Sequence, residues 1–158
     1  MAEPLSDQII RKVNQAAELY HRLILVIAPA GAGKTITLQK VRDQTGAPLI
    51  NVNFELSRRM LDLTERQRVL QLQSIIRDVL DDSGGELVLL DNIEILFDVD
   101  LKQDPLRLLQ LLSRDRTLVA AWNGTVDGET LTYAEPAHPE YRRYPIRDFL
   151  PVSPESNT

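Results

Sequence analysis

Residues 23–40 of the chain read LILVIAPAGAGKTITLQK, and this stretch decides the fold class. Leu23–Ala28 is continuously apolar, which is typical of a strand buried on both faces of a parallel sheet. A glycine-containing turn follows, and Lys34 opens a helix that we expect to end just before Gly46, since Pro48 comes soon after. A buried strand, a turn and a helix in this order predict an α/β domain.

The turn also matches a phosphate-loop pattern, G-x-x-x-x-G-K-[ST], with Ala28 at the position of the first glycine. Glycines let successive backbone N–H groups point inward around phosphate oxygens, and the helix N-terminus adds partial positive charge. Lys34 can reach the outer phosphates, and the Thr35 hydroxyl can ligate Mg²⁺. The alternative is a glycine turn with an exposed lysine. The residues that we expect to contact the nucleotide are Ala30, Gly31, Ala32, Gly33, Lys34, Thr35 and Ile36.

A phosphate-loop site needs a second part, which is an acidic residue at the end of another buried strand. Residues 86–91 read ELVLLD, so Asp91 ends a short apolar run. Its carboxylate can hold Mg²⁺ through water. The alternative is an aspartate that only caps a turn. With the phosphate loop present, we predict that Thr35 and Asp91 serve one Mg²⁺ ion.

Strand and helix patterns alternate through most of the chain. They predict a three-layer α/β fold with a mainly parallel sheet of about five strands, covered by helices on both faces. Two helix starts are well marked, because Thr64 and Gln67 form a capping-box signature and Asp104 precedes Pro105. After residue 123 we expect loops and one hairpin. The expected helices span residues 5–20 and 34–45 and follow Thr64 and Asp104, and the expected strands span residues 23–28, 48–52, 87–90, 118–122 and 146–150.

The composition sets further bounds. The length of 158 residues suits one domain, expected over residues 1–152, with a disordered tail over residues 153–158. The chain has no cysteine and no apolar run of membrane-spanning length, so we expect a cytoplasmic protein without membrane contact.

The net charge of −5 gives no general attraction to DNA. One local arginine cluster keeps a DNA contact open, and it comprises Arg58, Arg59, Arg66 and Arg68.

The order of these parts resembles that of the AAA+ ATPases. In that family the strand that ends in the metal-binding aspartate is followed by a strand that ends in a polar sensor residue, which positions the attacking water near the γ-phosphate. The matching residue is Asn123, directly after residues 118–122. Its alternative role is an ordinary Asn-Gly turn with Gly124. The resemblance implies an ATPase that uses ATP and Mg²⁺.

Longer stretches carry a narrower resemblance. They are residues 26–35, 51–59, 89–97, 102–107 and 120–125, and together they cover much of the chain. These stretches resemble the BrxF family, the small phosphate-loop proteins of type 3 BREX phage-defence systems. The resemblance implies a cytoplasmic bacterial defence component that binds ATP and works with larger partners, including a bigger ATPase and a DNA methyltransferase.

The general base is the first departure from the AAA+ pattern. That family places a glutamate directly after the metal-binding aspartate, and here the position holds Asn92. An amide can orient a water molecule but cannot take its proton. Glu94 lies two residues further on, on the same side as Asn92 if the strand continues, and Glu55 is a second candidate from a neighbouring strand. A third alternative is that the chain has no effective base.

AAA+ proteins also supply an arginine from one subunit to the γ-phosphate of the next, so the resemblance implies a homo-oligomer. Arg142 and Arg143 stand about where the family carries this arginine, and Arg114 and Arg116 are the second choice. The alternative for either pair is surface solvation or salt bridging. Because the chain ends close to its last expected strand, we expect neither the helical lid of the family nor the second sensor arginine in that lid.

The sequence therefore favours a Mg-dependent ATPase that works through oligomerisation and partner proteins, with Lys34, Glu94, Asn123, Arg142 and Arg143 as catalytic residues. One alternative is a switch that binds ATP without hydrolysing it, which Asn92 keeps open. Another is a small-molecule or nucleotide kinase. A kinase needs an acceptor pocket and usually an arginine-bearing lid over the phosphates, and residues 133–147 are the segment available for that role.

Overall fold

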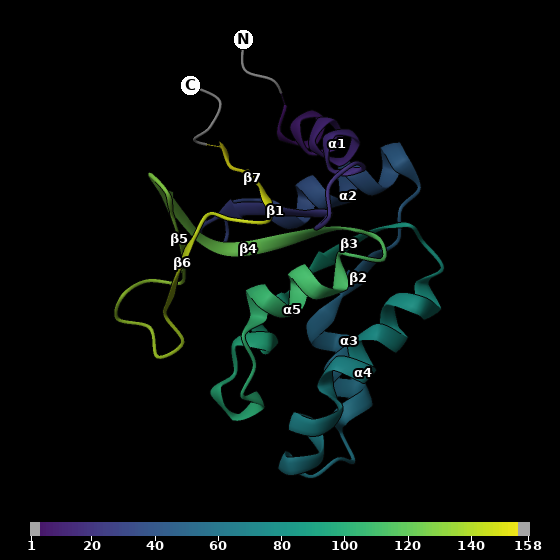
Figure 1. Cartoon of the computed structure of the whole chain (residues 1–158), viewed down its shortest axis with the longest axis vertical. Helices are drawn as coiled ribbons and strands as arrows, with labels where there is room; N and C mark the ends of the chain where they lie inside the picture. Colours follow the sequence, from purple (N-terminus) through teal and green to yellow (C-terminus); the bar gives the residue numbers. More distant parts are fainter. Residues whose placement is uncertain (1–3, 155–158) are drawn as a thin grey trace.

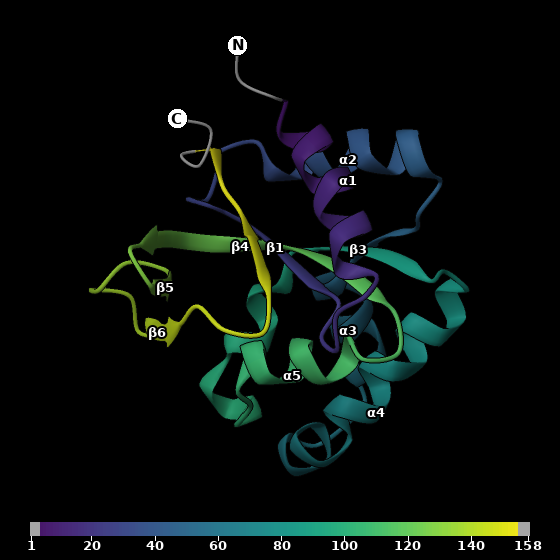
Figure 2. The same ribbon diagram turned by 45° about the horizontal axis from the view of Figure 1, so that its top comes forward.

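The computed structural model describes residues 4–154, and within this range seven strands form one sheet. Five of them are parallel and lie in the order β2-β3-β4-β1-β7. β5 and β6 continue antiparallel from the carboxyl-terminal half of β4 (Figure 2). The bounds are β1 Leu23–Ala28, β2 Leu49–Asn51, β3 Leu87–Asp91, β4 Thr117–Asp127, β5 Thr130–Tyr133, β6 Arg142–Pro145 and β7 Leu150–Val152. The predicted α/β class with a mainly parallel sheet is confirmed.

Helices cover both faces of the sheet. α1 (Leu5–Ala16) and α2 (Lys34–Thr45) lie on one face (Figure 1). α3 (Val52–Met60), α4 (Glu65–Ser83) and α5 (Pro105–Leu112) lie on the other face (Figures 1 and 2). The three layers follow from burial, because each face of the sheet is apolar and needs a helical cover.

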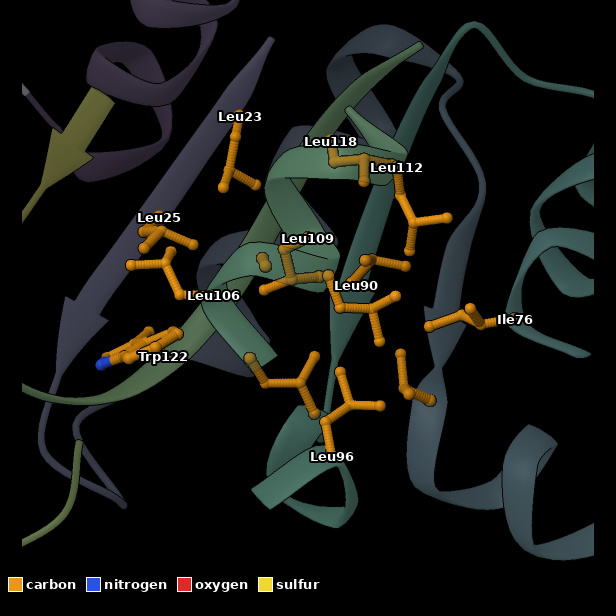
Figure 3. Close-up of a cluster of buried hydrophobic side chains, with 14 of the residues drawn as sticks. Leu23, Leu25, Ile76, Leu90, Leu96, Leu106, Leu109, Leu112, Leu118 and Trp122 are labelled. Carbon is orange, nitrogen blue, oxygen red and sulfur yellow. The ribbon is translucent and has the colours of Figure 1, made fainter. Parts of the chain in front are cut away.

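The core is divided by the sheet into two clusters, as the alternation of side chains along a strand requires. On β1, Ile24 and Val26 pack against α1 and α2. Leu25 points to the opposite face and joins the larger cluster, where Leu109 of α5 and Trp122 of β4 also lie (Figure 3). All six residues of β1 are buried, which explains why its sequence is continuously apolar.

The residues predicted to start α4 and α5 form the expected capping hydrogen bonds. Thr64 and Gln67 form both hydrogen bonds of the capping box at the start of α4. Asp104 accepts a hydrogen bond from the backbone N–H of Arg107, and Pro105 occupies the first turn of α5. These bonds satisfy N–H groups that have no partner within the helix.

Several predicted boundaries were wrong. α1 ends at Ala16, four residues before the expected end, and α3 was not predicted. The last strand, β7, lies at residues 150–152 instead of 146–150. β4 does not end at residue 122 but continues to Asp127, because its second half pairs with β5. Of the predicted tail, residues 155–158 lie outside the described residues.

The connections place several loops at one end of the sheet. The chain leaves β1 toward α2 on one face, and it leaves β3 toward α5 on the other face. In open α/β sheets, ligands bind in the crevice beyond the carboxyl ends of the strands. No helix in the described part of the chain has the length and apolar character that a membrane span needs.

Candidate functional site

Residues 28–35 run from the last residue of β1 to the second residue of α2, and we call this segment at the carboxyl end of β1 the glycine loop. Gly31 and Gly33 adopt left-handed backbone conformations, with φ of 81° and 88°. A Cβ atom at either position would meet nothing within 4 Å, so the backbone conformation, not lack of space, favours glycine. α2 begins directly after Gly33, so its unpaired first N–H groups lie at the end of the loop.

Lys34 is buried and spans the loop. Its Nζ atom donates hydrogen bonds to the carbonyl oxygens of Ala28 and Pro29, each at 2.8 Å. Burial lowers the pKa of Lys34, and the carboxylates of Glu94 and Asp91 oppose this shift. The ammonium group is therefore held inside the loop by two carbonyl oxygens.

A hydrogen bond joins the two predicted metal ligands. The Thr35 hydroxyl donates to Asp91 Oδ2 at 2.7 Å, and the N–H of Asn92 donates to Asp91 Oδ1 at 2.9 Å. A hydroxyl and a carboxylate fit Mg²⁺, which usually keeps several waters and takes further oxygens from phosphates. Within residues 4–154, no group of three or more His, Asp or Glu side chains could hold a metal ion on its own. A Mg²⁺ ion here therefore depends on oxygens from a bound phosphate and from water.

The chain turns sharply after Asp91. Asn92 has a left-handed conformation with φ of 55°, and a 3₁₀ helix, η1 (Ile93–Phe97), begins directly after it. β3 therefore does not continue through Glu94. The turn instead carries Glu94 to β4, where Asn123 Nδ2 donates a hydrogen bond of 2.5 Å to Glu94 Oε1.

Asn123 lies inside β4 and not in a turn, because it pairs with Ala28 at the carboxyl end of β1. Gly124 pairs with Tyr133 of β5 in the antiparallel part of the sheet. The alternative of an Asn-Gly turn is therefore wrong. The strand pairing places the Asn123 side chain beside the first residue of the glycine loop.

These elements enclose a cavity of about 420 Å³, which we call the glycine-loop cavity. It contains both predicted metal ligands, the loop lysine, the predicted base Glu94 and the predicted sensor Asn123. Of the seven residues expected to contact the nucleotide, only Ala32 is not in its lining. The lining residues are Ala30, Gly31, Gly33, Lys34, Thr35, Ile36, Asp91, Asn92, Glu94 and Asn123.

The second candidate base lies elsewhere. Glu55 is on α3 and accepts hydrogen bonds from Arg58 at 2.7 Å and from Arg59 at 3.4 Å. The hydrogen bond from Arg58 is the main cause that lowers the pKa of Glu55. Glu55 faces a different hollow, which Pro48 and Asp82 also line. The structure thus brings only Glu94 of the two glutamates to the glycine-loop cavity.

The predicted finger arginines do not line the glycine-loop cavity of their own chain. Arg142 of β6 donates to the carbonyl oxygen of Gln103 at 3.1 Å, and its neighbour Arg143 is exposed. The second pair lies near the amino end of β4. Arg114 stacks over the ring of Tyr20, and Arg116 forms an ion pair with Asp81.

The arginine cluster considered for DNA is partly engaged by acidic side chains. Arg58 pairs with Glu55, and Arg59 pairs with both Glu55 and Asp82. These ion pairs reduce the positive charge that a phosphate backbone would meet on α3.

Comparison of the chain with protein-family models, curated proteins and solved structures gave no match. The two family resemblances therefore remain predictions.

Proposed function

We propose that this chain binds Mg-ATP at the glycine loop and hydrolyses it. The observation that carries the proposal is the 2.7 Å hydrogen bond between Thr35 Oγ1 and Asp91 Oδ2. These residues are 56 positions apart in the sequence, and the fold brings together the two oxygen ligands that one Mg²⁺ ion would need. The two alternatives, a glycine turn without a ligand and an aspartate that only caps a turn, do not explain this contact.

Each residue of the cavity has a role in this proposal. The N–H groups of the glycine loop and of the start of α2 bind phosphate oxygens, and Lys34 exchanges its two carbonyl partners for them. Thr35 and Asp91 would hold Mg²⁺, which would neutralise the negative charge that develops on the phosphates. Glu94 accepts the proton of the attacking water, and the hydrogen bond from Asn123 holds the Glu94 carboxylate in place.

A second function, an ATP-dependent binding switch without turnover, is favoured by one observation. The position directly after Asp91 holds Asn92, which cannot accept a proton. In this reading, nucleotide binding at the glycine loop orders an interface, and Glu94 takes no proton.

On the strength of the longer resemblance, we also propose that the chain is a BrxF-like component of a bacterial BREX phage-defence system. In this role it is cytoplasmic, forms a homo-oligomer and works with a larger ATPase and a DNA methyltransferase. Co-purification of both partners with the tagged chain in the presence of ATP is the expected result. Recovery of neither partner with ATP or with ADP would remove this part of the proposal.

Nucleotide binding is tested by titrating a fluorescent ATP analogue with Mg²⁺ present or chelated. We expect Lys34→Met to abolish binding and Lys40→Met to leave it unchanged, because Lys40 is exposed on the same helix but outside the cavity. Equal affinities of the two variants would overturn the proposal. Release of ADP without any added acceptor would show hydrolysis, whereas ADP formed only with an acceptor would indicate a kinase.

A further inference from the structure

A second cavity adjoins the glycine-loop cavity and has a volume of about 700 Å³. The two cavities share Ala30, Glu94 and Asn123. Apart from Pro29, the rest of the lining comes from the β4–β5 hairpin and from residues 134–140, so we call it the hairpin cavity. Its volume lies within the range of small-molecule sites in proteins.

The wall of the hairpin cavity is preformed. Tyr133 is buried, and its ring stacks on Phe97 with 3.4 Å between centroids and an interplanar angle of 4°. The Trp122 indole N–H donates to the Thr132 carbonyl at 2.8 Å and fixes β5 against β4. In the loop, the N–H of Glu140 donates to His138 Nδ1 at 3.0 Å. A site held in this way loses little entropy when a ligand binds.

The charge of the wall is acidic. Glu94, Glu135 and Glu140 line the cavity, and no lysine or arginine does. Within residues 4–154, no ion pair neutralises Glu135 or Glu140. Burial raises the pKa of Tyr133, and the carboxylates of Glu94 and Glu140 add to this shift. Carboxylates from η1 and from the loop thus act on the same phenol group.

The remaining surface of the cavity is mainly apolar. Pro29, Ala134, Ala137 and Pro139 contribute small side chains, and Tyr133 contributes an aromatic one. Small apolar residues leave room for a flat body, and an acidic rim attracts a positive group and repels a negative one. A second nucleotide or another phosphate ligand does not fit this charge.

We propose that the hairpin cavity binds a small organic cation, an amidinium or ammonium group on a flat apolar body. The positive group lies near Glu135 and Glu140, and the body packs among Pro29, Ala137 and Tyr133. An occupant also contacts Glu94 and Asn123, which the two cavities share. This inference goes beyond the proposed function, because binding of the cation does not require a nucleotide at the glycine loop.

The test uses three probes of equal shape and different charge, which are benzamidinium, benzamide and benzoate. Each is titrated into the ¹⁵N-labelled full chain while backbone amide shifts are followed. We expect benzamidinium to give saturable shifts at residues 123–125 and 133–140, with an affinity about tenfold above that of benzamide, the size of one charge-assisted hydrogen bond. Benzoate is expected to give no saturable shift.

Variants locate the site and separate it from the nucleotide proposal. Glu135→Gln and Glu140→Gln are each expected to weaken benzamidinium binding severalfold, and Ala137→Phe is expected to block it by filling the cavity. Glu129→Gln is the matched control, because Glu129 is an exposed acid of the same hairpin outside the lining. Lys34→Met is expected to retain benzamidinium binding even though it loses nucleotide. The proposal fails if benzamidinium and benzamide bind equally, if their shifts lie elsewhere, or if Glu140→Gln binds as well as Glu129→Gln.

Discussion

Asn123 at the carboxyl end of the parallel part of β4 holds Glu94 through a hydrogen bond from Nδ2 to Oε1. The two residues are 29 positions apart, and the contact exists because the chain turns at Asn92 immediately after β3. The bond fixes a carboxylate at the wall that the glycine-loop cavity and the hairpin cavity share. An occupant of either cavity would therefore lie beside the Glu94 carboxylate.

Glu94→Gln tests the proposed base with little change in shape. The amide oxygen of glutamine can still accept the hydrogen bond from Asn123, but it cannot take a proton from water. We therefore expect ATP turnover to fall by about 100-fold or more, with the dissociation constant for Mg-ATP nearly unchanged. Single-turnover ADP formation and equilibrium nucleotide binding measure the two quantities separately.

Glu55→Gln is the matched control, because this glutamate is engaged by Arg58 on α3 and does not line the cavity. Its turnover is expected to equal that of the unmodified chain. Unchanged turnover in Glu94→Gln would remove Glu94 from the mechanism. Loss of turnover in Glu55→Gln would reverse the assignment of the base.

Lys34 predicts a pH dependence of nucleotide affinity. Burial lowers its pKa below the ordinary value of 10.5 in the free protein, and phosphate oxygens beside the ammonium would favour the charged form and raise the pKa again. Between the lowered pKa and 10.5, binding therefore takes up a proton, and affinity falls as the pH rises. Calorimetric titration in alkaline buffers of different ionisation enthalpy measures this uptake.

Lys34→Arg is the comparison for this prediction, because a guanidinium stays charged through the alkaline range. Any nucleotide binding that this variant retains is expected to occur without proton uptake. An affinity of the unmodified chain that stays constant up to the ordinary lysine pKa would show that Lys34 does not exchange its carbonyl partners for phosphate.

Much of the fold was predictable because its signals are local. The apolar run of β1 reflects burial on both faces, and Gly46 ends α2 in the left-handed conformation that its position requires. The capping box at Thr64 needs only residues within one helical turn. The glycine loop and Asp91 were found in the same way, because each adjoins a strongly apolar segment.

The missed features either have a weak local pattern or depend on contacts between distant segments. α3 begins directly after β2 with a cap from Asn51, and its many polar residues weaken the helical pattern. The second half of β4 is a strand only because β5 lies against it, so residues Asn123 and Gly124 read as a turn in isolation. The approach of Glu94 to Asn123 depends on one backbone conformation, at Asn92, which the residue type permits but does not require.

The close packing around Gly124 predicts that a larger residue there destabilises the β4–β5 hairpin. A Cβ atom at this position would lie 1.8 Å from the carbonyl oxygen of Thr132, a backbone atom that cannot move away easily. We expect Gly124→Ala to lower the free energy of unfolding by about 3 kcal/mol, as overpacking does, and to loosen the wall of the hairpin cavity. Urea denaturation followed by tryptophan fluorescence measures the change, because Trp122 donates its indole N–H to Thr132.

Gly128→Ala is the control for this effect. Its φ of 60° makes alanine strained, but a Cβ atom there would meet nothing within 4 Å. The expected loss is only about 1 kcal/mol. A loss in Gly124→Ala no larger than that in Gly128→Ala would contradict the close approach of β5 to β4.

The last prediction concerns completion of the site by a second copy of the chain. Arg143 is exposed on β6 and does not line the glycine-loop cavity of its own chain, whereas Lys34 does. If Arg143 reaches the γ-phosphate of a neighbour, turnover per molecule rises with protein concentration, and Arg143→Ala lowers it by about 1000-fold.

Lys34→Met is expected to be inactive for a different reason, because this variant does not bind nucleotide but keeps Arg143. A mixture of the two variants is then expected to recover activity that neither has alone, since one contributes the nucleotide site and the other the arginine. Arg147→Ala, at another exposed arginine close to the end of β6, is the control and is expected to keep full turnover. A mixture that shows only the sum of the separate rates would mean that Arg143 is not shared between chains. A rate independent of concentration would mean that each chain completes its own site.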